Sequence, residues 1–143
     1  MTYLVKEFMS EEIVTIAAEA NVAEASKKIA ENPRGYTVVL QNGQPTGMVT
    51  ERDLVRKVFA KSLDPSKVKV SDVMSSPLVS IDPDEELSKA AETMKANDVR
   101  KLPVAREGIL YGIITARDIA DHFNEYVDKA TKEIIKYSAP FRF

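Results

Sequence analysis

An internal duplication is the feature of this 143-residue sequence that most constrains its fold. When the sequence is shifted against itself, residues 5–58 align with residues 70–123 without a gap, and most apolar residues fall on apolar residues. The closest matches are VKEFMS with VSDVMS, near the start of each copy, and GMVTERD with GIITARD, near its end. A register kept over this distance indicates a duplicated supersecondary unit, which defines the architecture before any local pattern does.

Both copies carry the same order of predicted elements: a strand, a helix, two strands and a closing helix. The first strands are predicted at 13–16 and 78–81, and the hairpin strands at 36–40, 46–50, 102–105 and 110–115. Apolar residues at i, i+3, i+4 and i+7 predict helices that begin at Val22 and Leu87. The closing helices carry the apolar residues Leu54, Val55, Val58 and Phe59 in the first copy, and Ile119, Ala120 and Phe123 in the second.

A unit of about 55 residues buries too little surface to be stable alone, so two copies should cover each other's sheets. The expected fold is therefore α/β (α+β), with two β-α-β-β-α repeats packed sheet to sheet about a pseudo-twofold axis. We expect the first repeat at residues 1–61, a linker at 62–69 and the second repeat at 70–123. Residues 124–143 are predicted to extend the last helix and end in an aromatic tail.

The composition argues against several classes of function. The chain has 20 basic and 22 acidic residues, which give a net charge of −2. Nucleic-acid binding is therefore not expected, because it requires an excess of basic residues. There is no cysteine and a single histidine, His122, which disfavours thiol chemistry, a catalytic triad and a zinc site. No metal site and no enzymatic activity are expected. No apolar run is long enough for a membrane span, and the first residues do not form a signal peptide, so we expect a cytoplasmic protein.

A Gly-x-x-Thr-x-Arg-Asp motif recurs where the last strand of each copy runs into its closing helix. Its members are Gly47, Thr50, Arg52 and Asp53, and Gly112, Thr115, Arg117 and Asp118. Thr and Asp at this spacing are typical of a capping box at a helix start. The same carboxylate can also accept the two hydroxyls of a ribose, and the glycine lets a ligand approach the backbone. The two interpretations are compatible, because one Asp can cap the helix when the site is empty and hold the ribose when a ligand is bound.

These motifs, together with LPV at residues 102–104, make the chain similar to a tandem pair of cystathionine-β-synthase (CBS) domains, a Bateman module, over residues 5–123. The resemblance implies two clefts that bind adenosine-containing ligands: AMP, ADP, ATP, S-adenosylmethionine or NAD. It implies no resident cofactor. The ribose is held by Asp53 and Asp118, with Thr50 and Thr115 beside ribose and phosphate and Arg52 and Arg117 in the same motif.

By the same resemblance, the end of the first strand and the start of the second flank adenine and phosphates. In the first copy the residues are Thr15, Ile16, Gly35, Tyr36 and Thr37, and in the second they are Ser80, Ile81, Arg100, Lys101 and Pro103. Each cleft combines the Asp of one copy with the second-strand start of the other. The cleft of Thr50, Asp53, Arg100 and Lys101 is the first candidate, because the other, with Gly35 and Tyr36, has less positive charge.

The function expected is a regulatory module that senses an adenine nucleotide. The alternative is a structural or interaction module with degenerate clefts that acts through dimerisation. A homodimer is expected in either case, since the apolar stripe of the last helix and the aromatic tail need a cover. Because no effector domain is recognisable, regulation would act on an unidentified target protein or within an oligomer.

Overall fold

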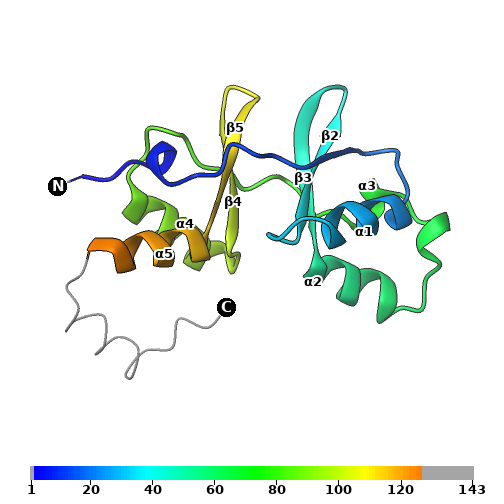
Figure 1. The fold of residues 1–143 in the computed structure, drawn as a ribbon. Helices are drawn as coiled ribbons and strands as arrows, with labels where there is room; N and C mark the ends of the chain where they lie inside the picture. Colours follow the sequence, from blue (N-terminus) through cyan, green and yellow to red (C-terminus); the bar gives the residue numbers. More distant parts are fainter. Residues whose placement is uncertain (1, 127–143) are drawn as a thin grey trace, which may run out of the picture.

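Two β-hairpins stand side by side in the computed structural model, each with its helices gathered near one end of the hairpin (Figure 1). The structure describes residues 2–126, with side chains described up to residue 123. The aromatic tail and most of the predicted extension at 124–143 lie outside the described residues. Each hairpin belongs to one copy of the duplicated sequence, so the expected mixed fold with two related units is confirmed.

The first repeat builds a three-stranded sheet in the order β1-β2-β3, with β1 parallel to β2 and β2 antiparallel to β3. Its helix α1 starts where the Asn21 side chain accepts a hydrogen bond from the Glu24 amide at 3.0 Å. A five-residue π-helical stretch, η2, continues α2 directly. The elements are β1 (Thr15–Ala17), α1 (Val22–Ala30), β2 (Tyr36–Gln41), β3 (Gln44–Thr50), α2 (Glu51–Leu54) and η2 (Val55–Phe59).

The second repeat has the same plan with a smaller sheet, in which β4 pairs antiparallel with β5. A short element begins each copy, η1 in the first and α3 in the second. A third short element, η3, lies in the predicted linker. The second repeat comprises α3 (Val70–Val73), α4 (Leu87–Asn97), β4 (Lys101–Arg106), β5 (Ile109–Thr115) and α5 (Ala116–Tyr126). Outside it in sequence lie η1 (Val5–Glu7) and η3 (Pro65–Lys67).

The strand predicted at 78–81 is wrong: only Ile81 forms a bridge there, to Val104. In the first repeat the Ala18 amide donates to the Leu40 carbonyl at 2.9 Å and so extends the pairing of β1. The equivalent position in the second repeat is Pro83, which has no N–H to donate. A second donor is missing as well, since the Val38 amide, which donates to the Val14 carbonyl at 2.8 Å, is replaced by Pro103. Together the two prolines reduce the third strand to a bridge.

The hairpins pack on each other through a cluster of Tyr36, Val38, Met48 and Ile113, which confirms the sheet-to-sheet packing. Apolar side chains on these inner faces alternate with residues that face each repeat's own helices, as pleated strands require. Val39 and Val49, for example, belong to the cluster beneath α1. The core therefore has three parts, one between the sheets and one within each repeat.

The segments that lead into the two repeats are exchanged. Val5 and Phe8 from the chain start are buried in the core of the second repeat, and Val70 and Val73 are buried in the core of the first. Backbone bridges hold the exchange, from Ser10 to Ile113 and from Ser75 to Met48. Each half of the molecule is thus completed by residues that belong, in sequence, to the other copy.

The exchange also explains the glycine of the recurring motif. A Cβ on Gly47 would lie 2.8 Å from the Ser75 carbonyl oxygen, and one on Gly112 would lie 2.5 Å from the Ser10 carbonyl oxygen. The close approach that the sequence suggested for a ligand is therefore made by the protein's own backbone. Met9 and Met74 lie against the same glycines as packing residues.

Candidate functional site

Both Thr-x-x-Asp motifs form capping boxes. The Thr50 amide donates to Asp53 Oδ2 at 3.0 Å, and the Asp53 amide donates to Thr50 Oγ1 at 3.4 Å. The corresponding bonds between Thr115 and Asp118 are both 3.0 Å long. The first carboxylate oxygen of each motif is thus used at the start of a helix, as the spacing predicts.

The second oxygen of Asp53 is also occupied. Asp53 Oδ1 accepts from Ser75 Oγ at 3.0 Å and lies 3.1 Å from Lys57 Nζ. Lys57 also donates to the Val73 carbonyl oxygen at 3.0 Å. Because Asp53 is only 7% exposed, Lys57 and the hydroxyls compensate the charge that burial would otherwise penalise.

The second oxygen of Asp118 is bound by the other repeat. Arg34, just before β2, donates from Nη2 to Asp118 Oδ1 at 3.1 Å. The Nε atom of Arg34 is buried and has no hydrogen-bond partner. Sequence reasoning missed Arg34, because the alignment of the copies places it opposite the apolar Val99; its position directly before Gly35 was the available signal.

The start of β4 faces the first repeat in the same way. Arg52 in α2 pairs with Asp98, which ends α4, at 3.4 Å. Burial lowers the pKa of the Lys101 ammonium, and the nearby Glu51 carboxylate opposes that shift. Each Thr-x-x-Asp helix therefore lies against the other repeat at the start of its hairpin, which is the crosswise arrangement that the resemblance implied. We call the two places the Asp53 site and the Asp118 site.

Five residues predicted to contact the ligand have buried side chains. Ile16 and Ile81 belong to the cores of their repeats, and Pro103 is buried in β4. Tyr36 fills the space between the sheets, where burial raises its pKa and its hydroxyl donates to the Glu12 carbonyl at 3.3 Å. Thr37 Oγ1 donates to the Val14 carbonyl at 3.3 Å. In this conformation the side chains of these five residues hold strands together, and their contact with a ligand stays a prediction.

The remaining predicted residues differ in exposure: Asp53 and Thr115 are buried within their capping boxes, whereas others are accessible and one lines a pocket. Ser80, Arg100 and Arg117 are exposed, while Gly35 is a buried turn residue with a φ of 64°. Thr15 lines a pocket of about 470 Å³ that reaches Arg34 and so borders the Asp118 site. The other lining residues are Glu12, Ile13, Val14, Lys28, Glu31, Asn32 and Pro33. The charges of this lining balance, because Lys28 and Arg34 stand against Glu12 and Glu31.

Comparison with known proteins identifies the family. The CBS domain family matches residues 5–60 and again residues 70–125. This chain belongs to the CBS domain family. Paired CBS domains form a class of regulatory modules, and the chain is such a pair.

Relatives of this CBS pair include longer proteins. It is 32% identical to an uncharacterized protein of Methanopyrus kandleri over 80% of this chain and 60% of that protein. It is 35% identical to an uncharacterized protein of Methanocaldococcus jannaschii over 80% of this chain and 40% of that protein. The chain thus spans less than two thirds of these relatives.

A solved structure has the same architecture. The hexameric CBS-CP12 protein from bloom-forming cyanobacteria matches with a TM-score of 0.79 and 30% identity, over 95% of this chain and 78% of that one. Neither a cluster of metal-ligating side chains nor a membrane-spanning helix occurs among the described residues. Among residues 2–126, no group of three or more His, Asp or Glu side chains is placed to hold a metal ion. Within the same range, no helix has the length and apolar character that a bilayer crossing demands.

Proposed function

We propose that this CBS pair is a regulatory module that senses an adenosine-containing nucleotide of the AMP, ADP or ATP class between its two repeats. The observation that carries the proposal is the crosswise contact of each Thr-x-x-Asp helix with the hairpin start of the other repeat. A ligand bound there touches both repeats at once. Its binding energy is therefore available to change how they sit against each other.

At the Asp118 site the ion pair between Arg34 and Asp118 supports the binding of two ligand groups. A ribose diol would replace Arg34 as the partner of Asp118, and the released guanidinium would take a phosphate, which it binds well in two-point geometry. The unpartnered Nε of Arg34 supplies one more donor for that phosphate. The adjoining pocket of about 470 Å³ falls within the range of ordinary ligand pockets.

At the Asp53 site the ribose would compete with Lys57 and Ser75 for Asp53 Oδ1. Arg100 and Lys101 would receive the phosphates. The lowered pKa of Lys101 supports this role, because a buried ammonium is stabilised when an anion comes next to it. Arg52 can turn to the same phosphates, since its pair with Asp98 is long and exposed.

Calorimetric titration of AMP and ATP into the wild type, Asp53→Asn and Asp118→Asn tests the proposal, with S-adenosylmethionine and NAD as further ligands. A lost hydrogen bond to a charged acceptor costs about 1.5–3 kcal/mol, so each variant should lose about 10- to 100-fold in affinity at its own site. Asp121→Asn, an exposed position on α5, is the matched control and should bind like the wild type. Equal nucleotide affinity in all four proteins would leave the two aspartates as helix caps only.

An interaction module with degenerate sites is the second candidate function. It is favoured by the complete internal pairing of both carboxylates and by the apolar side chains of Val55, Phe59 and Phe123, which are exposed on the closing helices. The cyanobacterial relative is a hexamer, which supports assembly as a property of this architecture. On this view, a homodimer presents a surface to an unidentified target protein, and no nucleotide in the panel binds.

A further inference from the structure

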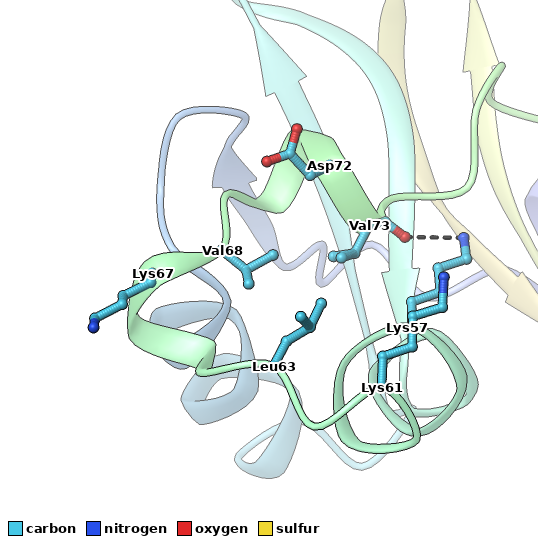
Figure 2. A pocket seen from close by; sticks show the side chains of 7 residues that line it. All are labelled: Lys57, Lys61, Leu63, Lys67, Val68, Asp72 and Val73. Atoms are coloured by element: carbon cyan, nitrogen blue, oxygen red, sulfur yellow. Dashed lines mark hydrogen bonds between the residues drawn. The ribbon is translucent and has the colours of Figure 1, made fainter.

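A second pocket, of about 370 Å³, borders the Asp53 site through Lys57, where η2, the linker and α3 meet (Figure 2). Leu63, Val68 and Val73 point toward one another and form its apolar floor. Lys57 and Lys61 lie along one wall, with Lys67 at the opposite rim. Three ammonium groups against the single carboxylate of Asp72 give the rim a positive charge. We call this place the linker pocket.

The second repeat carries aromatic rings at the equivalent positions. In the alignment of the two copies, Val68, Val73 and Lys57 correspond to Tyr3, Phe8 and His122. There the rings of Tyr3 and Phe8 meet edge to face with centroids 5.6 Å apart, and those of Phe8 and His122 with centroids 4.4 Å apart. Aromatic rings in edge-to-face contact thus stand, in one repeat, where the other carries two valines and a lysine.

We propose that the linker pocket binds a small aromatic carboxylate. The ring of the ligand would lie on Leu63, Val68 and Val73, in the place that Phe8 and Tyr3 occupy in the other repeat. Its carboxylate would reach the ammonium groups of Lys57 and Lys61. An uncharged aromatic compound would gain no ion pair with these cations, and an inorganic anion would leave the apolar floor exposed to water.

Lys57 connects the linker pocket to the Asp53 site. Its ammonium is shared between Asp53 Oδ1, at 3.1 Å, and the Val73 carbonyl oxygen, at 3.0 Å. A carboxylate in the pocket would draw Lys57 away from Asp53 and free that oxygen for a ribose hydroxyl. The pocket ligand should therefore strengthen nucleotide binding, and by linkage the nucleotide should strengthen binding in the pocket. This link, unlike the pocket itself, rests on the proposed nucleotide function.

Titration of the full chain with phenylacetate, followed by NMR, tests the pocket without any nucleotide. We expect saturable binding that is at least fivefold tighter than that of phenylacetamide or inorganic phosphate. Val68→Tyr introduces the residue found at the equivalent position, Tyr3, and should abolish the binding. Lys61→Gln should weaken it severalfold. Lys95→Gln, an exposed lysine on α4, is the control and should leave it unchanged.

If Val68→Tyr does not fold, Leu63→Gln at a 43% exposed position replaces it and should also weaken the binding. Equal affinity for phenylacetate and phenylacetamide, or wild-type affinity in the pocket variant, would overturn the proposal. A last titration adds AMP to protein saturated with phenylacetate, where AMP affinity should rise about fivefold. Unchanged AMP affinity would overturn the Lys57 link. Absence of any AMP binding would overturn the proposed function and leave the pocket standing on the first titration.

Discussion

At the scale of single residues, Asp53 and Asp118 have one role in common and one in which they differ. Both cap a helix through a threonine three residues earlier, a contact that depends only on local spacing. Their second oxygens differ: Asp53 pairs with Lys57 one helical turn away, whereas Asp118 pairs with Arg34 from the other repeat. Two equivalent positions in a duplicated sequence have therefore become electrostatically different.

Arg34→Gln should separate ligand binding from stability. The Arg34–Asp118 pair is partly exposed, with side chains 32% and 15% accessible, so its loss should cost less than about 1 kcal/mol of unfolding free energy. AMP affinity at the Asp118 site should fall about tenfold, because the phosphate loses its charged donor. Calorimetry and urea denaturation measure both quantities, with Arg56→Gln as an exposed control. A large loss of stability with unchanged affinity would make Arg34 a purely structural residue.

Arg106→Gln should have an effect that depends on pH. Hydrogen bonds from Arg106 lower the pKa of Asp82 from 3.8 to about 2, and Lys6 and Arg106 together lower the pKa of Asp84. A lowered native pKa contributes stability that is present above about pH 4 and is lost as the pH falls toward 2. The melting temperature of the variant should therefore lie below that of the wild type at pH 7. The gap should close between pH 4 and pH 2. A gap of the same size at pH 7 and pH 2 would contradict this assignment.

At the scale of elements, two very short segments join the two halves of the molecule. The elements η1 and α3 span 3 and 4 residues, yet each completes the core of the opposite half of the molecule. They can do so because β3 and β5 each carry a glycine where the incoming backbone passes. A strand with a side chain at that point would hold the segment away, since packed interiors do not absorb an extra methyl group easily.

Gly47→Ala should therefore destabilise the fold, although glycine is a poor residue for a strand interior. The new methyl would lie 2.7 Å from Met74 Sδ and 2.8 Å from the Ser75 carbonyl oxygen, and overpacking of this kind costs about 1–3 kcal/mol. Gly112→Ala should behave alike. Gly43→Asn is the control, because Gly43 has open space around it and asparagine tolerates its positive φ. Urea midpoints for Gly47→Ala and Gly43→Asn that coincide would show that the segment can move aside without cost.

At the scale of the whole molecule, the exchange of segments makes the two halves interdependent. A chain cut at the sequence boundary loses Val70 and Val73 from the core beneath α1. A fragment of residues 11–75 keeps both valines, although its ends do not coincide with those of the sequence repeat at residues 1–61. We expect this fragment to hold more helix by circular dichroism, and a higher urea midpoint, than a fragment of residues 1–61. The opposite order would mean that the exchanged segments contribute little to the cores.

The exposed apolar side chains on the closing helices predict a homodimer. Val55, Phe59 and Phe123 are 59%, 67% and 49% exposed, and burying them against a second copy removes this surface from water. Light scattering at micromolar concentration should give twice 15.9 kDa for the wild type. Phe59→Glu should give the monomer mass, because a charge at the interface has no partner there. A wild-type mass of 15.9 kDa would remove the dimer from consideration.

The sequence by itself determined the plan of the fold and the local chemistry of the motif. The duplication predicted two equivalent units, apolar periodicity placed the helices α1 and α4, and the Thr-x-x-Asp spacing predicted both capping boxes. Each of these depends on contacts between residues close in the chain, or on a repeat that can be read directly. The strand at 78–81 was wrongly predicted because Pro83 and Pro103 lack two N–H donors that the corresponding pairing of the first repeat uses, and their absence outweighed the apolar pattern.

Only the tertiary structure decided which residues meet across the two repeats. Arg34 reaches Asp118 over 84 positions, and Ser75 reaches Asp53 over 22. The exchange of η1 and α3, the burial of Tyr36 and the opening of the linker pocket are of the same kind. Sequence periodicity shows which side of an element is apolar, but not which distant segment covers it. That choice depends on how side-chain volumes fit together in the assembled core, where one repeat carries two valines at positions that hold two aromatic rings in the other.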